Sequence, residues 1–356
     1  MRVLIVCTVE FEMNGIVSVI MNYFRLCRKE ILFDFLVHRN AEECLSREIE
    51  QYGSNIYVVD RKKKFIEYVS VLKRIIKNSN YDAIHVHGNS ATMAIELLIA
   101  KKLKIKTRIA HCHNSQCNHK LMHCLLRPIF NKSYTKAVAC SEEAGDWIYK
   151  GKPYIVIENG INVSKFCFNQ KIRDKMRKEF ELEDKFIIGH VGLLNYQKNH
   201  DKLFEIFKQV KEKCSEAFLL CVAGDKCVPD NILQKIREIG IDKDIKILLC
   251  RNDVEELLQM MDFFVFPSRW EGLGMAAIEA QASGLYCLAS EKVPSRIDIT
   301  PYCKHLSLND TAEKWCNVIL QNKDIDINRY DMNELVKKSV FDIGKCRTKL
   351  MKIYTE

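Results

Sequence analysis

Two carboxylates, Glu271 and Glu279, lie eight residues apart in the stretch FPSRWEGLGMAAIEAQASG, residues 266–284. From Gly274 onward this stretch predicts a helix built mostly from Met, Ala and Ile, with no polar stripe to which Glu279 could belong. A glutamate is rarely buried without a partner. The partner of Glu279 is therefore either a basic side chain elsewhere in the fold or a bound ligand, and the sequence leaves both alternatives open.

The turn before this helix is suited to hold phosphate and hydroxyl groups. Gly272 and Gly274 flank the turn. A helix that starts in this way offers unpaired backbone N–H groups and the positive end of its dipole. Two nearby carboxylates can accept hydrogen bonds from vicinal diols. The stretch therefore indicates a pocket for a ligand that carries both phosphate and sugar.

The elements that must position these residues predict an α/β fold. Strand and helix patterns alternate along the first half of the chain and start again after residue 168, which predicts two doubly wound parallel sheets. Two domains also agree with a length of 356 residues. Ligands of such sheets bind beyond the carboxyl ends of the strands, so we expect the site in the cleft between the domains. The predicted strands include RVLIVCTV, FDFLVH, YDAIHVHG, TRIAHCHN and KAVACS, then KFIIGHVG, AFLLCVAG, IKILLC and FFVFPS.

The net charge of +9 lies entirely in the first half. Residues 1–168 hold 25 Lys and Arg against 16 Asp and Glu, whereas the remainder holds 30 of each. A basic half can face nucleic acid, an anionic membrane or a phosphorylated substrate. No pattern of a nucleic-acid-binding module is found, so we expect no nucleic-acid partner. The first residues predict a buried strand rather than a signal peptide, and no apolar run reaches the ~20 residues of a membrane span.

The sixteen cysteines do not indicate a disulfide framework. They are scattered, and several lie in apolar strands, as Cys7 and Cys221 do, which is typical of reduced cytosolic thiols. The segment HCHNSQCNHKLMHC, residues 111–124, holds enough His and Cys to raise the alternative of a metal site. It lacks a C-x2-C pair or another recognised zinc pattern, which favours scattered core and surface residues instead.

The stretch FPSRWEGLGMAAIEAQASG resembles the E-x7-E segment of retaining glycosyltransferases of family 4. Further segments resemble that family in the same order along the chain. NGIVSVIMNYF is similar to its glycine loop and first helix, YDAIHVHGNS and RIAHCHNS to its His-bearing strand ends, and GHVGLLNYQKNHDKLFEIF to its phosphate-binding opening. The segments ACSEEAGDWIY and VIENGINVSKF are similar to the end of its N-terminal domain, and FDIGKCRTKLMKIY to its final helix.

The resemblance covers nearly the whole chain and is nearest to members that act in bacterial capsule and exopolysaccharide assembly. It implies a GT-B fold, in which two facing Rossmann-like doubly wound domains enclose an interdomain cleft. The implied parts are an N-terminal acceptor-binding domain at 1–167, a C-terminal nucleotide-sugar-binding domain at 168–335, and a C-terminal helix at 336–356 that crosses back to the N-terminal domain.

The resemblance also implies a role for individual residues. Glu279 would hold the ribose hydroxyls of the nucleotide, Glu271 would lie at the donor sugar, and Lys198 would bind the diphosphate. His113 would lie near the donor sugar. Each has a simpler alternative, since Lys198 could be a surface lysine and His113 a core histidine. Further donor-binding candidates are Asn14, Gly15, Arg251, Gly272, Leu273, Gly274 and Met275, and candidates for the wall of the acceptor cleft are His85, His87, Asn89 and Ser90.

Two positions depart from the family pattern. The family usually has an arginine five residues before the phosphate lysine, where this chain has Leu193. Its N-terminal loop often has two glycines, and in this chain Asn14 takes the place of the first. Loss of a fork-shaped phosphate ligand weakens diphosphate binding by roughly 2–4 kcal/mol if nothing replaces it. Either Arg251 or Arg269 compensates, or turnover is slow or absent.

The reaction implied is a retaining, hexosyltransferase-type transfer from a nucleoside diphosphate sugar, in the first place a UDP-sugar, to a saccharide. In this family a phosphate oxygen of the donor is thought to accept the acceptor proton, so no side-chain base is required. We expect no cofactor and no metal, because Lys198 and the helix start supply positive charge. The alternatives are a degenerate homologue that binds a nucleotide sugar without turnover, and a sugar-nucleotide epimerase of the same architecture.

The preferred acceptor is a lipid-linked oligosaccharide. Residues 117–136 mix Leu, Ile and Phe with Lys and Arg, and RKKK at 61–64 adds basic charge, as contact with an anionic bilayer requires. A core helix and a solvated turn are the alternatives for these two segments. The expected location is cytoplasmic, with reversible peripheral attachment at the inner face of the plasma membrane as an open alternative.

Overall fold

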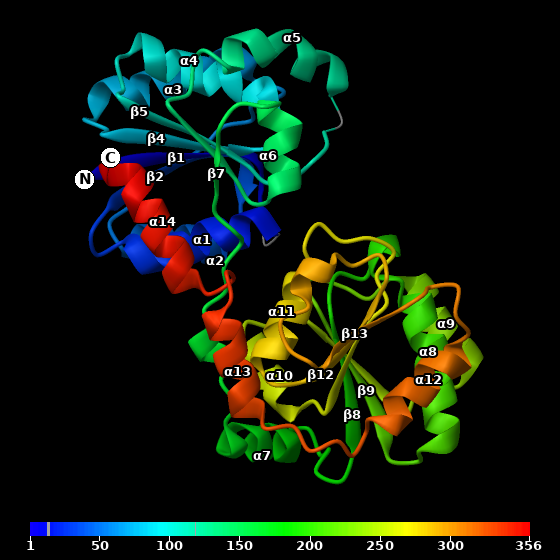
Figure 1. Cartoon of the computed structure of the whole chain (residues 1–356). Helices are drawn as coiled ribbons and strands as arrows, with labels where there is room; N and C mark the ends of the chain where they lie inside the picture. The colour runs from blue at the N-terminus through cyan, green and yellow to red at the C-terminus, as the bar shows by residue number, and fades with distance from the viewer. Residues whose placement is uncertain (13–14, 118) are drawn as a thin grey trace. The chain divides into compact units, whose positions relative to one another are not determined.

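The structure is a computed structural model that describes residues 1–12, 15–117 and 119–356. It divides into two compact units, one formed by Met1–Gly160 with Ile343–Glu356 and the other by Ile161–Asp342 (Figure 1). In the described part of the chain, no helix combines the length and the apolar character that crossing a membrane requires.

The first unit is built on a seven-stranded sheet with the order β3-β2-β1-β4-β5-β6-β7, in which all paired strands are parallel. The sheet is buried on both faces, because alternate residues of β1 enter two different cores: Val3 and Ile5 one, Leu4 and Val6 the other. Its elements are β1 (Arg2–Phe11), α1 (Gly15–Cys27), β2 (Leu32–Ala41), α2 (Glu43–Gln51), β3 (Ile56–Val58), α3 (Phe65–Asn78), β4 (Ala83–Gly88), η1 (Ala91–Met93), α4 (Ala94–Lys102), β5 (Thr107–Cys112), α5 (Lys120–Phe130), β6 (Lys136–Ala139), α6 (Glu142–Tyr149), β7 (Ile155–Val156) and α14 (Ile343–Thr355).

The second unit has a six-stranded sheet with the order β10-β9-β8-β11-β12-β13, again parallel throughout its pairs. Helices α7, α10, α11 and α13 contribute to the core on one face, and α8, α9 and α12 to the core on the other. Its elements are η2 (Val163–Phe166), α7 (Gln170–Glu179), β8 (Phe186–Val191), η3 (Tyr196–Lys198), α8 (His200–Lys213), β9 (Ala217–Ala223), α9 (Asp230–Ile239), β10 (Ile245–Leu249), α10 (Val254–Met260), β11 (Phe263–Phe266), α11 (Met275–Ala282), β12 (Tyr286–Ser290), η4 (Ser295–Ile297), β13 (Cys303–Leu306), α12 (Ala312–Gln321) and α13 (Arg329–Lys338).

The predicted α/β class with two doubly wound parallel sheets is confirmed. Both sheets follow the order third, second, first, fourth and fifth strand, which is the order of Rossmann-like folds. The order reverses between β1 and β4 in the first unit and between β8 and β11 in the second. Ligands of such sheets bind beyond the carboxyl ends of the strands at this reversal, so the residues that follow β8 and β11 are the first to consider.

The boundaries of the two compact units differ from those of the parts expected from the sequence, which were 1–167, 168–335 and 336–356. The first unit stops at Gly160, because Ile161, Val163 and Phe166 pack in a core of the second unit. Helix α13 also belongs to the second unit, where Val336 is buried. The chain then re-enters the first unit as α14, which lies beside α1 (Figure 1) and buries Leu350 and Tyr354 in the core.

Candidate functional site

Lys198 and Glu271 meet where the strand order of the second unit reverses. Lys198 ends η3 in the loop after β8, and Glu271 lies in the loop after β11. The Lys198 Nζ atom lies 2.7 Å from Oε1 of Glu271, and the two side chains are 15% and 7% exposed. Nε2 of Gln197 donates to the other carboxylate oxygen at 3.2 Å. The two loops therefore place a fixed cation and a fixed carboxylate side by side.

Backbone contacts hold these two loops together. Asn199 adopts a left-handed conformation with φ of 59°, and its Nδ2 donates to the carbonyl oxygen of Pro267 at 3.0 Å. The backbone N–H of Arg269 donates to the carbonyl oxygen of Gln197 at 2.8 Å. A Cβ atom at Gly192 would lie 2.8 Å from Cε of Lys198, so only glycine lets the lysine side chain run along this backbone.

The glycine-flanked turn leads directly into α11. Gly274 is the N-cap of this helix with φ of 93°, a conformation that favours glycine, and a Cβ atom there would lie 3.1 Å from Cγ1 of Val293. No side chain of the described residues caps the helix. Gly272 is exposed, and Leu273 and Met275 are partly exposed. The first turn of α11 is thus open to an external acceptor such as a phosphate or hydroxyl oxygen.

Glu279 lies on α11 and keeps some exposure. Burial and, to a smaller extent, the Glu255 carboxylate raise the pKa of its carboxyl to about 7, although the nearby Lys198 ammonium acts to lower it. Within the described ranges, no hydrogen bond or ion pair to this carboxyl is found. Among these residues, the structure therefore shows no basic side chain in contact with Glu279, which was one of the two alternatives for its partner.

The basic residues considered as substitutes for a missing arginine have other contacts. Leu193, at the position of the family's arginine, is 41% exposed to solvent. Arg251 forms an ion pair with Asp253, in which Nε lies 2.8 Å from Oδ1. Arg269 lies over the Tyr196 ring at 4.2 Å, and its Nε donates to the Tyr196 carbonyl oxygen. Of the two arginines, Arg269 is the one tied to the loop that carries Lys198.

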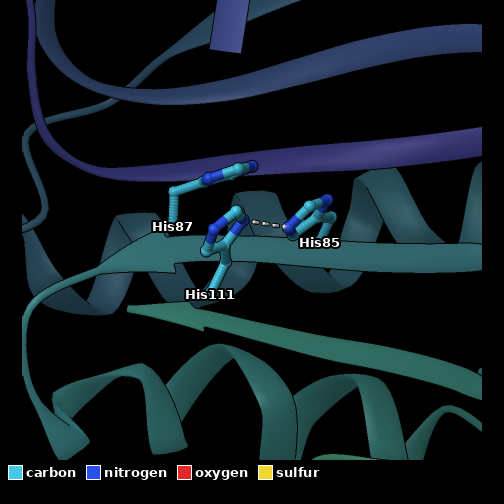
Figure 2. Close-up of side chains that lie close together, drawn as sticks. All are labelled: His85, His87 and His111. Atoms are coloured by element: carbon cyan, nitrogen blue, oxygen red, sulfur yellow. Dashed lines mark hydrogen bonds between the residues drawn. The ribbon is translucent and has the colours of Figure 1, made fainter. Parts of the chain in front are cut away.

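In the first unit, four histidines from neighbouring strand ends form a cluster. His85 and His87 lie on β4, His111 on β5, and His113 just beyond it. His87 pairs with His111 in the sheet register, and alternate residues of a strand share a face, so all four side chains lie on one face of the sheet. Figure 2 shows the rings of His85 and His111 joined by a hydrogen bond of 3.1 Å, with His87 beside them.

His85, His87 and His111 are buried, His113 is partly exposed, and the four imidazoles are neutral at physiological pH. Burial is the main cause that lowers the pKa of all four, to about 3 for His113, and the neighbouring rings lower the pKa of the other three further. Nδ1 of His85 lies 2.6 Å from the Tyr354 hydroxyl of α14, and Nδ1 of His87 lies 2.9 Å from Nε2 of His113. Nε2 of His111 has no partner among the described residues.

The residues considered for the acceptor wall differ in accessibility. His85 and His87 are 1% and 2% exposed, so contact with an acceptor would require their rings to move. Ser90 caps η1 by accepting from the N–H of Thr92, and the Asn89 carbonyl oxygen accepts from Trp147 Nε1 at 3.3 Å. Gly15 starts α1 and is exposed, and Asn14 lies outside the described residues.

The His and Cys residues of 111–124 do not all converge on one point, because His111 and His113 belong to the cluster on β4 and β5 and the others lie elsewhere. His111 joins His85 and His87, whereas Nδ1 of His123 accepts from the N–H of Ala91 and its ring stacks on Trp147 at 4.6 Å. His119 is exposed at the start of α5. Scattered core and surface residues are therefore the reading that fits this segment.

Sequence reasoning missed three residues that position the Lys198–Glu271 pair of the second unit. Gln197, Asn199 and Gly192 each position Lys198 or the loop that carries Glu271. An asparagine directly after Lys198 and before a helix is a signal for a left-handed turn that could have been used. The roles of Gln197 and Gly192 depend on contacts with distant residues and had no local signal.

Two protein-family models match the chain. A model described as Glycosyltransferase Family 4 matches residues 24–165, and a model described as Glycosyl transferases group 1 matches residues 171–300. A protein of Bacillus subtilis (strain 168) named as glycosyltransferase EpsF is 28% identical over 86% of this chain and 84% of its own length. The capsular polysaccharide biosynthesis glycosyltransferase CapH of Staphylococcus aureus is 24% identical over 94% of this chain and 93% of its own length.

A third relative and a solved structure extend the comparison. The UDP-Gal:alpha-D-GlcNAc-diphosphoundecaprenol alpha-1,3-galactosyltransferase of Escherichia coli is 26% identical over 66% of this chain and 63% of its own length. The crystal structure of Anabaena HepE in complex with UDP superposes with a TM-score of 0.79 at 15% identity and covers 99% of both chains. HepE has also been solved in complex with UDP-glucose.

Proposed function

Since the chain belongs to the glycosyltransferases that join a family 4 domain to a group 1 domain in the GT-B fold, we propose that it transfers a hexose from a UDP-sugar to a saccharide acceptor with retention of configuration. UDP is the proposed nucleotide because HepE binds UDP and UDP-glucose and the Escherichia coli relative acts on UDP-Gal. The pathway we propose is polysaccharide assembly, in keeping with CapH.

The observation that carries this proposal is the Lys198–Glu271 pair beside the open start of α11. In the absence of a ligand, the lysine neutralises the carboxylate. A diphosphate would compete for the Lys198 ammonium, and Glu271 would then be free to accept hydrogen bonds from sugar hydroxyls. Glu279, whose carboxyl has no partner in the described chain, would accept from the ribose diol.

The proposed transfer requires positive charge near the diphosphate leaving group. As the bond between the anomeric carbon and the diphosphate breaks, negative charge grows on the phosphate oxygens, and Lys198 with the first N–H groups of α11 would stabilise it. A phosphate oxygen of the donor would accept the acceptor proton on the same face of the sugar. This assignment calls for neither a metal ion nor a cofactor at the diphosphate.

For the acceptor we propose a saccharide carried on a lipid diphosphate, as the name of the Escherichia coli relative describes for its own substrate. Support comes from exposed apolar side chains of the first unit, since Ile66 on α3 is 86% exposed, and Leu121 and Leu125 on α5 are 73% and 62% exposed. Exposed lysines at 62–64 and Lys120 lie next to them in sequence. Apolar side chains next to cations suit reversible contact with an anionic bilayer.

The experiment is a calorimetric titration with UDP, GDP, ADP and CMP, followed by a transfer assay with UDP-hexoses. We expect UDP to bind, and Glu279→Ala to lose at least tenfold in affinity, since about 1.5–3 kcal/mol accompanies a hydrogen bond to a charged group. Glu256→Ala, a change to another partly exposed carboxylate of this unit, serves as the matched control and should bind UDP normally. A folded protein that binds no nucleotide would refute the proposed function.

Leu193→Arg, tested in the same assays, separates the transferase from a degenerate binding protein. If Arg269 or another group already compensates, the transfer rate changes little. A large gain from a rate near zero would instead show that the natural chain binds the donor without turnover. An epimerised nucleotide sugar formed without any acceptor would favour the epimerase alternative.

A further inference from the structure

Three side chains with metal-binding atoms converge at the edge of the second sheet, and the proposed sugar transfer uses none of them. β13 is the edge strand, and Cys303 and His305 lie two residues apart on it, so both point to the same face. Asp298 follows η4, five residues before Cys303. Each of the three offers one ligand atom, and these atoms lie within 4.8 Å of one another.

The His305 ring is held in the orientation that a metal ligand needs. Its Nδ1 lies 2.9 Å from the carbonyl oxygen of Ser290, which can only accept, so Nδ1 carries a proton and donates. This leaves Nε2 as the atom that faces the Asp298 carboxylate, at 2.6 Å from Oδ1. Metal-binding histidines usually donate their other ring N–H to a carbonyl or carboxylate in this way, which fixes the tautomer.

Charge and access also suit a divalent cation. On binding zinc, Cys303 would release its thiol proton to solvent, and the resulting thiolate and the Asp298 carboxylate would together offset two positive charges. Asp298 is 40% exposed and the His305 side chain 21%, so an ion can enter from solvent. The set of thiolate, imidazole and carboxylate is the one that zinc takes in proteins.

The histidine cluster of the first unit is the competing candidate, since ligand atoms of His85, His87 and His111 also lie within 4.8 Å of one another (Figure 2). Both ring nitrogens of His85 already have hydrogen-bond partners. The neighbouring cavity is lined by apolar and aromatic side chains such as Ile5 and Phe24. A divalent cation there would have no anionic ligand from this set and would be costly to bury.

We propose that Asp298, Cys303 and His305 form a zinc site, with a solvent molecule as the fourth ligand. Tetrahedral zinc with bonds of about 2.0–2.1 Å places its nitrogen and oxygen ligands about 3.3 Å apart. His305 Nε2 and Asp298 Oδ1 are closer than this, so the ion would take the place of the proton between them while the exposed Asp298 side chain moves outward by less than 1 Å.

A metal at this site would stabilise the segment between β12 and β13 that packs against α11. Between β12 and β13, the N–H groups of Ile299 and Thr300 donate to Oε1 of Gln281, which lies on α11 two residues after Glu279. Nε2 of Gln281 donates to the carbonyl oxygen of Ile297 at 2.7 Å. A metal that fixes Asp298 to β13 would therefore hold the segment on which the donor-binding helix rests.

The test is zinc binding by the whole chain after dialysis against EDTA and a phosphine reductant, measured in competition with a fluorescent zinc chelator. We expect one zinc per chain and a Co²⁺ complex with a thiolate charge-transfer band. Cys303→Ser and His305→Gln should each weaken zinc binding at least about 100-fold, since even loss of an outer partner costs 10–100-fold. Asp298→Asn, an exposed change that leaves the core intact, should weaken it at least about tenfold.

Two matched controls complete the experiment. Cys316→Ser removes another buried thiol of the same unit, and His111→Gln alters the competing cluster, so both should bind zinc as the wild type does. The proposal is overturned if the wild-type chain takes up no zinc, if Asp298→Asn and Cys303→Ser keep full affinity, or if His111→Gln is the variant that loses it. In the first case His305 and Asp298 form an ordinary ion pair.

Discussion

Mild acid is expected to unfold the first unit, because its four clustered histidines are neutral when folded. The pKa of each lies well below the ordinary value near 6.5, so the unfolded chain binds protons that the folded unit excludes. Stability is therefore complete above pH 6.5 and falls as pH drops through that value. At pH 5.5 each histidine costs about 1.4 kcal/mol and the four together roughly 5–6 kcal/mol, which is comparable to the whole stability of a typical domain.

His111→Gln tests this reasoning, since it removes one protonation site and keeps a polar side chain of similar length. Denaturant unfolding is measured between pH 4.5 and 6 by fluorine NMR of protein labelled with fluorotryptophan. Trp147 then reports the first unit, and Trp270 and Trp315 report the second. The variant should lower the slope of unfolding free energy against pH, as seen by Trp147, by about 1.4 kcal/mol per pH unit.

His200→Gln is the matched control in the second unit, where burial lowers the pKa of His200 to about 4. It should reduce the slope seen by Trp270 and Trp315 and leave that of Trp147 unchanged. The reasoning is refuted if His111→Gln leaves the slope seen by Trp147 unchanged, because His111 would then already be protonated in the folded unit.

Two further predictions concern Glu279 and the apolar surface of the first unit. Because the folded pKa of Glu279 is raised to about 7, ionisation at pH 8 opposes folding. Glu279→Gln should therefore raise the unfolding free energy of the second unit by about 3 kcal/mol at pH 8 and by almost nothing near pH 4, while UDP affinity falls. Stability and affinity that fall together would contradict this. Co-sedimentation with phosphatidylglycerol vesicles should weaken at least about tenfold in Ile66→Glu/Leu125→Glu and remain unchanged in Leu233→Glu, an exposed position of the second unit, whereas equal losses would argue against the proposed membrane contact.

Much of the fold could be predicted because the chain alternates strand and helix patterns with little ambiguity. Lys198 and Glu271 could be placed at one edge of the second sheet because both follow strands, and the carboxyl ends of parallel strands share an edge. Their direct contact at 2.7 Å could not be predicted, since 73 residues separate them and the loop geometry depends on Asn199 and Pro267. The same limit applies to the long-range hydrogen bonds of Gln197.

The histidine cluster of the first unit and the Asp298, Cys303 and His305 cluster of the second could not be predicted from the sequence, for different reasons. The histidines at 85, 87, 111 and 113 have the spacing of residues on one strand face, but only the register of β4 and β5 shows that the two pairs meet. Asp298 ends the short η4 turn, and residues 299–302, which connect it to Cys303 on β13, carry no strong sequence signal. Neither cluster could be derived from local pattern alone, because the first depends on the pairing of β4 with β5 and the second on the conformation of the turn that brings Asp298 back to β13.

The return of the chain as α14 means that the first unit is finished last during synthesis. Its core includes Leu350, Ile353 and Tyr354, which the ribosome adds only after all of residues 161–342. At roughly 5–20 residues per second, that interval lasts about 10–40 s. Throughout it, the apolar face that α14 later covers has no native partner from this helix, and at its end the second unit has its whole sequence while the first unit still lacks α14. We therefore expect the second unit to fold first and a nascent chain stalled near residue 342 to bind chaperones through the first.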